Sequence, residues 1–343
     1  MTYREIITSL TPYQISCLFF FKIRHNFNMR FSWLMPYLDL SMKNFLLCLF
    51  RYIFTLGYRI SSPSKTNNQQ SPEPQSLKSP HNSFFIVAHP DDIELFMGRE
   101  ARHQILEQPE NKKIFIVLSA GDANRKNRKK IFREITWWKA REQAHTLAIS
   151  YWNKNRNLAH ESEITVNHRK MTKITLGASI ILYNFRLTDA DKTTSLNDLI
   201  HQNSQEIYDL AHHQAYRKQD IQTSLLELIE YENIGAQSAA FYIMDESYDR
   251  NPGDHKDHKA TSEIFKEIYT QISVQDKSLH GYLTYFIQEK VINLEGEDKH
   301  VSFETWRIIA DELERNGYKR NDDPHHMQWV GKEYKSYEIK TLD

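Results

Sequence analysis

The 343-residue sequence contains only two cysteines, Cys17 and Cys48, and both lie in its amino-terminal part. A framework of disulfide bonds is therefore absent, and cysteine use does not identify the cellular compartment. A surplus of charge of one sign is lacking too, because 44 basic side chains balance 44 acidic ones. The strong positive charge that is typical of nucleic-acid-binding proteins is thus missing, and we expect no nucleic-acid partner.

Hydrophobic runs as long as a membrane-spanning helix needs, about 20 apolar residues, are also missing. The two main apolar clusters, Cys17–Phe21 and Phe45–Tyr58, are short, and Arg51 interrupts the second. Basic residues beside them are typical of a helix that lies in a membrane interface. A helical hairpin packed on the next domain, or sequence upstream of a later start methionine, is the alternative. No small-residue cleavage site follows an apolar core, so a secretory signal fits poorly.

Three regions follow from this composition. We expect residues 1–60 to be an N-terminal extension, and peripheral contact with a membrane is one alternative for its role. The protein is then expected to be cytoplasmic or attached to a membrane surface. Residues 61–83 are rich in Ser, Pro, Asn and Gln, which predicts a flexible linker. The folded domain then covers residues 84–343. No internal repeat is found.

In this domain, short apolar runs alternate with longer helical patterns. Strands separated by helices predict βαβ units, and therefore an α/β fold with a mostly parallel sheet and helices on both faces. The expected strands are 84–87, 114–118, 179–183, 239–244 and 281–287. The expected helices are 94–107, 131–148, one or two within 196–230, 260–271 and 303–315, followed by a polar tail.

The segment after the first expected strand reads Ala88-His89-Pro90-Asp91-Asp92. Ligands bind at the carboxyl ends of strands in open parallel sheets. A histidine and two aspartates packed there would be costly to keep charged unless a cation joins them, and a metal ion is the simplest candidate. The alternative is a His-Pro turn followed by aspartates that cap a helix.

A second polar segment, Asp254-His255-Lys256-Asp257-His258, follows the fourth expected strand. His255 and His258 are three residues apart, so one helical turn can place both imidazoles on the same side. A solvated, charged helix start is the alternative. Together, the two segments could supply His and Asp ligands with an open position, which is the pattern of catalytic zinc sites.

These segments, together with Gly121-Asp122 after the second expected strand, resemble the motifs of the PIG-L/LmbE-like family of zinc-dependent de-N-acetylases. The resemblance covers roughly residues 84–287. It implies a Rossmann-like α/β domain that holds one zinc ion per chain. It also implies that the substrate is a small N-acetylglucosamine-type sugar or conjugate, from which the acetyl group is removed by hydrolysis.

The resemblance implies a role for each motif residue. It makes His89, Asp92 and His258 the zinc ligands. It makes Asp91 the general base that activates the attacking water. It makes His255, in protonated form, the residue that assists the oxyanion and the leaving amine.

Four further residues are candidates around this site. Asp189 resembles the acidic residue that follows the corresponding strand in relatives, where it could orient His255; a simple loop carboxylate is the alternative. Arg125, Arg128 and Lys129 lie in a basic segment after the second expected strand. They could bind a phosphate of the substrate or a membrane headgroup, or form a solvated loop.

The chain departs from the family pattern at one informative place, since Ile93 stands where the commonest motif has Glu, and Glu94 follows it. Two rival functions remain open. A metal-dependent phosphoesterase would use similar His and Asp clusters for two metal ions. A catalytically inert, membrane-tethered sugar-binding relative would keep the motifs without turnover.

Overall fold

The computed structural model describes residues 81–122, 135–153, 159–189, 195–320 and 324–341. The expected extension, the expected linker up to residue 80, and the basic candidates Arg125, Arg128 and Lys129 lie outside the described residues. Within those ranges, no helix combines the length and the apolar character that crossing a bilayer requires.

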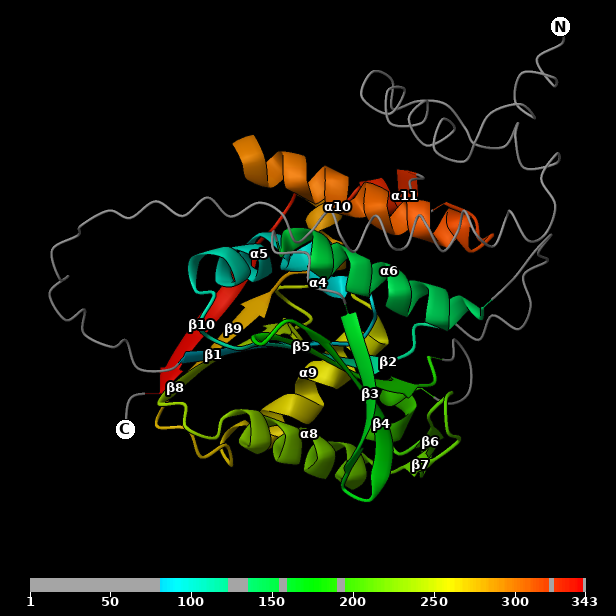
Figure 1. The fold of residues 1–343 in the computed structure, drawn as a ribbon, viewed down its shortest axis with the longest axis vertical. Coiled ribbons are helices and arrows are strands. Elements are labelled where there is room, and N and C mark those ends of the chain that lie inside the picture. Colours follow the sequence, from blue (N-terminus) through cyan, green and yellow to red (C-terminus); the bar gives the residue numbers. More distant parts are fainter. Residues whose placement is uncertain (1–80, 123–134, 154–158, 190–194, 321–323, 342–343) are drawn as a thin grey trace, which may run out of the picture. The chain divides into compact units, whose positions relative to one another are not determined.

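An eight-stranded mixed sheet, in the order β10-β9-β8-β1-β2-β5-β4-β3, is the centre of the fold (Figure 1). Neighbouring strands from β9 to β5 run parallel, whereas β10 at one edge and β4 and β3 at the other are antiparallel to their neighbours. The strands are β1 (His81–Val87), β2 (Lys113–Ser119), β3 (Ala159–Val166), β4 (Arg169–Leu176), β5 (Ile180–Leu187), β8 (Ser238–Met244), β9 (Asp276–Tyr282) and β10 (Lys335–Thr341). A separate two-stranded hairpin consists of β6 (Ile207–Tyr208) and β7 (Ala215–Tyr216).

Helices cover both faces of the sheet (Figure 1). One face carries α4 (Asp92–Phe96), α5 (Gly98–Glu107), α6 (Trp137–Trp152), α10 (Gly296–Arg315) and α11 (Pro324–Met327). The other face carries α7 (Leu196–Ile200), α8 (Lys218–Glu232) and α9 (Lys256–Tyr269). A 3₁₀ helix, η3, covers Tyr285–Glu289. The predicted α/β class, with a mostly parallel sheet and helices on both faces, is therefore confirmed.

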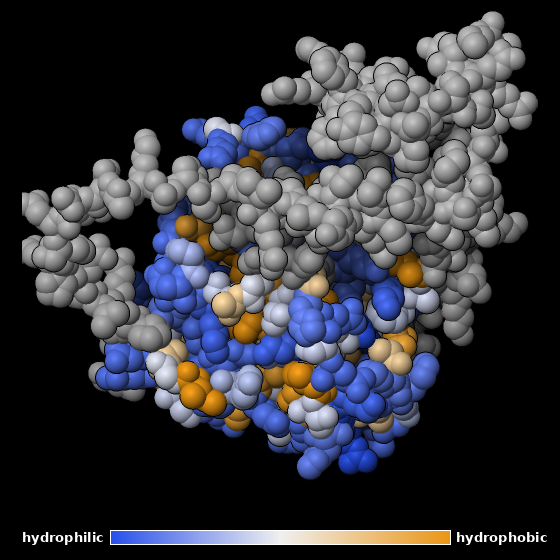
Figure 2. All heavy atoms as spheres, in the orientation of Figure 1, coloured by the Kyte–Doolittle hydropathy of each residue, from blue (hydrophilic) through white to orange (hydrophobic). Residues whose placement is uncertain are grey.

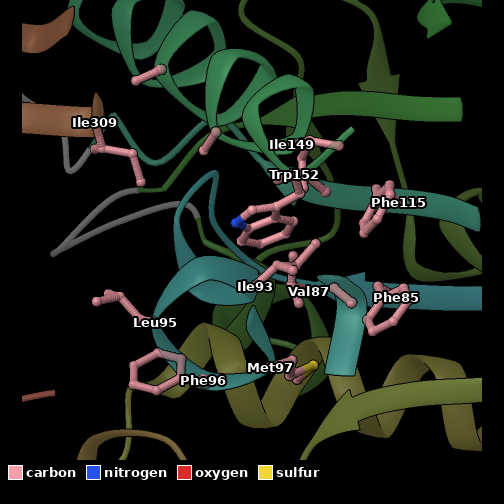
Figure 3. Close-up of a cluster of buried hydrophobic side chains, with 14 of the residues drawn as sticks. Phe85, Val87, Ile93, Leu95, Phe96, Met97, Phe115, Ile149, Trp152 and Ile309 are labelled. Atoms are coloured by element: carbon pink, nitrogen blue, oxygen red, sulfur yellow. The ribbon is translucent and has the colours of Figure 1, made fainter. Parts of the chain in front are cut away.

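Strand β1 shows why its sequence is apolar without alternation. Phe85 and Val87 point into the core beneath α4, α5 and α6, whereas Phe84 and Ile86 point into the core beneath α8 and α9. In the first core, Trp152 packs beside Ile93 and Val87 (Figure 3). Because successive side chains of a strand alternate between faces, a strand that is covered on both faces needs apolar residues throughout.

Burial separates this interior clearly from the surface. On the side shown in Figure 2, the described residues are mostly hydrophilic, and the apolar ones form small, separate groups. The buried apolar side chains form two clusters, one on each face of the sheet.

Several expected elements differ from the structure. Strands β3, β4 and β10 were not expected, because their polar, partly exposed residues lack the apolar run that marks a buried strand. The expected strand 281–287 is wrong, since β9 ends at Tyr282 and the chain turns into η3. There Tyr285 stacks on Trp329, with 4.6 Å between ring centroids. This contact with a residue far along the chain overrides the local strand propensity.

Candidate active site

The site lies where β1 is flanked by β2 on one side and β8 on the other. Strand β2 follows β1 along the chain and lies on one side of it, whereas β8 comes later and lies on the other side. The order in which strands are added therefore reverses at β1. All three strands are parallel, and their carboxyl ends share one edge. Side chains from the loops after β1 and β8 therefore meet in the crevice that such a switch point creates.

Three nitrogen and oxygen donors converge in this crevice. His89 Nδ1 lies 3.1 Å from His258 Nε2, and His258 Nε2 lies 3.1 Å from Asp92 Oδ1. His89 Nδ1 lies 3.4 Å from Asp92 Oδ2. Ligand atoms about 2.0–2.1 Å from a tetrahedral zinc ion are roughly 3.3 Å apart. All three side chains are buried, and they lie close enough to hold a single divalent cation, although the two approaches to Asp92 use different oxygens of its carboxylate. Donor atoms of His89, His255 and His258 also lie within 4.8 Å of one another, so His255 is a further candidate ligand.

The surroundings of His258 favour such a role. Its Nδ1 lies 2.7 Å from Asp254 Oδ1, which leaves Nε2 directed at the other donors. Thr284 Oγ1 and Asn251 Nδ2 donate to the Asp254 carboxylate. A carboxylate behind a histidine is the usual support of a metal ligand, because it sets the tautomer. Burial lowers the pKa of His258, but the Asp92 and Asp254 carboxylates outweigh it and raise that pKa well above its usual value, so a cation bound here would take the place of the Nε2 proton.

The other ring nitrogen of His89 faces Asp189. The distance from His89 Nε2 to Asp189 Oδ2 is 3.6 Å, and the buried Nε2 has no hydrogen-bond partner within the described residues. The backbone N–H of Asp189 donates to Asp122 Oδ1 over 2.8 Å. Burial raises the pKa of Asp189, but His89, His255 and Arg141 together hold it below its usual value. Asp189 therefore lies in the site, with its carboxylate beside His89.

His255 is brought within reach of the same centre. Its ring centroid lies 4.8 Å from that of His89 and 5.4 Å from that of His258. As the N-cap of α9, its Nδ1 accepts the backbone N–H of Asp257 over 3.2 Å. Burial first, and then His89 and His258, lower the pKa of His255 to about 3. The structure thus favours a neutral imidazole that carries its proton on Nε2, in contrast to the protonated form expected from sequence.

Asp257 adds a further buried carboxylate. Its Oδ1 accepts the backbone N–H of Asn197 over 3.0 Å, and burial, with the neighbouring Asp189, raises its pKa to about 6. Donor atoms of His89, Asp189 and Asp257 lie within 4.8 Å of one another. This group shares His89 with the first donor set. Since His89 Nδ1 faces His258, Nε2 is the nitrogen on the Asp189 side of the ring.

Asp91 is the N-cap residue of α4, but its side chain makes no capping hydrogen bond. Its carboxylate instead pairs with Arg141 of α6. The capping alternative for Asp91 is therefore wrong. Ile93 and Glu94 also differ in role, because Ile93 is fully buried in the core and a Glu94 carboxylate oxygen lies 2.7 Å from Nδ1 of the buried His145.

Sequence reasoning missed two residues that reach the site. Arg141 lies on α6, and only the ion pair with Asp91 identifies it. Tyr285 lies in a segment that was expected to be a strand, and its ring centroid lies 5.2 Å from that of His258. Burial, followed by the charges of Asp92, Asp91 and Asp254, raises the pKa of Tyr285, so the phenol keeps its proton. No local sequence signal marks either contact.

Comparison with protein families gives one match, to PIG-L, described as GlcNAc-PI de-N-acetylase, over residues 84–269. The chain belongs to this family. The matched residues make up more than half of the 343-residue chain and contain both polar segments of the site. The PIG-L match ends before η3, so Tyr285 lies outside it. No curated protein matches the sequence.

Several solved structures are similar to the PIG-L chain. N,N'-diacetylchitobiose deacetylase from Pyrococcus horikoshii, complexed with its inhibitor MPG, is 11% identical over 74% of each chain, with a TM-score of 0.39. The zinc-inhibited form of teicoplanin deacetylase Orf2 is 11% identical over 72% of this chain and 90% of that chain, with a TM-score of 0.38. The 4-carboxy-2-hydroxymuconate hydratase GalB from Pseudomonas putida KT2440 is 9% identical over 73% and 81% of the chains, with a TM-score of 0.35.

Proposed function

We propose that this PIG-L family member is a zinc-dependent hydrolase that removes the acetyl group from an N-acetylglucosamine-type sugar or conjugate. The observation that carries the proposal is the convergence of His89 Nδ1, Asp92 and His258 Nε2 at separations of 3.1–3.4 Å, next to Asp91. This donor set supports one metal ion per chain. The family description, GlcNAc-PI de-N-acetylase, supports the reaction and the sugar.

In this proposal, His89, Asp92 and His258 hold the metal ion. A zinc ion there would supply a Lewis acid for the acetyl carbonyl and would lower the pKa of the attacking water. Asp254 and Asp189 keep the two imidazoles oriented, because each carboxylate faces the ring nitrogen that points away from the donor set.

Asp91 and His255 carry the proton transfers. Asp91 accepts a proton from the attacking water and returns it to the leaving amine. The neutral His255 donates its Nε2–H to the oxygen that becomes negative in the tetrahedral intermediate. A neutral donor is sufficient for this task, since an oxyanion is stabilised by any well-placed N–H.

Recognition beyond the acetylated sugar is also part of the proposal. Arg125, Arg128 and Lys129 would bind a phosphate of the conjugate, because Arg and Lys are the usual partners of phosphate oxygens. Residues 1–60 would provide peripheral contact with a membrane surface, through their mixture of apolar and basic side chains. Liposome binding that survives removal of residues 1–60 would contradict the second point.

Acetate release from a panel of N-acetylglucosamine conjugates tests the proposal. We expect the zinc-loaded protein to release acetate from at least one conjugate, and Asp91→Ala to reduce that rate strongly while one zinc per chain is retained. Two bridged metal ions with phosphate release would instead indicate a phosphoesterase. Sugar binding without acetate release would indicate an inert relative. Either result would reject the deacetylase.

A further inference from the structure

Arg141 connects the ends of two neighbouring strands. Its Nη1 donates to the backbone carbonyl of Gly121, after β2, over 2.5 Å. Its Nη2 donates to Asp91 Oδ1, after β1. Only 13% of the Arg141 side chain is exposed, so the guanidinium is largely closed off from solvent. The other carboxylate oxygen of Asp91, Oδ2, is not the one that Arg141 holds.

The helix that carries Arg141 is itself tied to the strands around the site. One turn further along α6, His145 Nδ1 lies 2.7 Å from Glu94 Oε1. Arg186 of β5 pairs with Glu142 through two hydrogen bonds of 2.7 and 2.5 Å. All these side chains are buried. Such buried, geometrically matched pairs leave little freedom for α6 to move relative to the segment that contains Asp91.

Gly121 is shaped to admit the guanidinium. Its φ of +60° is a conformation that favours glycine. A Cβ atom at this position would lie 2.0 Å from Arg141 Nη1 and 3.1 Å from Pro90 Cδ. Any larger residue would therefore push Arg141 away from both of its acceptors. The glycine serves the approach of Arg141 in addition to the turn.

We propose that Arg141 is a positioning residue that fixes the carboxylate of Asp91 for proton transfer, and that Gly121 is required because it gives the guanidinium room. The inference rests on the proposed function, in which Asp91 is the base. With Oδ1 anchored, the carboxylate presents Oδ2 alone to the water, and a misplacement of about 1 Å can cost on the order of 100-fold in rate. A role for Arg141 in binding substrate fits less well, because both terminal nitrogens already have acceptors.

Kinetics of Arg141→Met separate positioning from binding. For the N-acetylglucosamine conjugate on which the native protein is most active, we expect kcat to fall about 100-fold while KM changes less than about threefold. The zinc content should equal that of the native protein. A rise in KM at unchanged kcat would assign Arg141 to substrate binding, and loss of zinc would assign it to the metal site. Both results would overturn the proposal.

Gly121→Ala provides a second route to the same loss. We expect Gly121→Ala to lower kcat about as much as Arg141→Met does. Because both substitutions remove the same contact, the variant that carries both should be no slower than the slower single variant. Gly235→Ala is the matched control, because Gly235 has φ +81° but no atom within 4 Å of its added Cβ. It should keep native kcat. Equal kcat losses at both glycines would show that backbone strain is the cause and would overturn the role of Gly121.

A double-mutant cycle on thermal stability tests the ion pair between Arg141 and Asp91 without measuring enzyme activity. Unfolding midpoints are compared for the native protein, Arg141→Met, Asp91→Asn and the double variant, all freed of metal. We expect the shift of the double variant to be smaller than the sum of the two single shifts. Additive shifts would refute the pairing. Coupled shifts in a protein that releases no acetate would refute Asp91 as a base and leave Arg141 a structural residue only.

Discussion

His89 uses its two ring nitrogens for two different neighbours. Nδ1 faces His258 and Asp92, whereas Nε2 faces Asp189. Replacing one partner therefore disturbs either the donor set or its support. The same division of labour separates His258, whose Nε2 belongs to the donor set, from His255, whose Nδ1 is occupied by a backbone N–H.

From this division, we predict that His258→Ala loses bound zinc, because one of three donor atoms disappears. His255→Ala should keep its zinc and lose turnover, since only the N–H offered to the oxyanion is removed. Loss of one oxyanion donor typically lowers kcat about 100- to 1,000-fold. Metal analysis of the purified variants, together with acetate release, provides the test. Equal zinc loss in both variants would contradict the assignment.

At this scale, the sequence predicted which residues meet but not what supports them. His89, Asp92 and His258 come together because they follow β1 and β8, which are adjacent in the sheet. The family resemblance implied this grouping, whereas order along the chain alone does not show that the two strands are neighbours. Asp254 was known only as part of the same polar segment, and its pairing with His258 is visible only in the structure. Arg141 could not be identified, because its partner is 50 residues earlier and their approach depends on how α6 packs.

Among the helices, α5 has an unusual N-terminus, because its free backbone N–H groups are satisfied by a buried glutamate from outside the helix. Glu333, just before β10, accepts the N–H groups of Arg99 and Glu100 over 2.7 and 3.3 Å. Burial raises the pKa of Glu333 from 4.5 to about 7, although Arg99 and these N–H groups oppose the rise. The native fold therefore binds this proton more tightly than the unfolded chain does.

We predict that Glu333 makes the free energy of unfolding fall as the pH rises from about 4.5 to 7, by roughly 3 kcal/mol at most, with no further loss from this group above pH 7. Glu333→Gln, which can still accept from the helix, should remove that part of the pH dependence. Denaturant unfolding at several pH values measures it. The exposed Glu289→Gln is the control, and an unchanged slope in Glu333→Gln would contradict the prediction.

Elements were predictable where burial determines the sequence. The apolar runs of β1, β2 and β8 are covered on both faces, so their identity was readable. Strands β3 and β4 are exposed enough to be polar, and the pairing of β4 with β5 and of β3 with β4, rather than composition, makes them strands. The start of α9 at Lys256 rather than Ala260 reflects the N-cap at His255, which the polar sequence concealed.

On the scale of the whole molecule, the recognisable family region is not the folding unit. The match ends at Tyr269, but β9, α10 and β10 complete the sheet and the core beneath α6. Trp306, Ile309 and Leu313 of α10 are buried in that core. Thr284, also beyond the match, donates to Asp254 behind His258.

We therefore predict that a fragment of residues 81–269 does not fold cooperatively, because it exposes the surfaces of α6 and α4 that α10 covers and the edge of β8 that pairs with β9. A fragment of residues 81–341 should show a single thermal transition and a near-ultraviolet circular dichroism spectrum like that of the full chain. A sharp transition in the shorter fragment would show that the C-terminal elements are dispensable.

The two antiparallel edge strands have a consequence for self-association. Both outermost strands carry charge, with Glu161 and Glu163 on β3 and Lys335, Glu338 and Lys340 on β10. A second copy that added its own strand to either rim would have to bring these polar side chains together in the new sheet. The apolar parallel strands in the centre of the sheet would promote aggregation if they lay at an edge. The charged edge strands β3 and β10 separate them from other copies and so oppose the growth of fibrils.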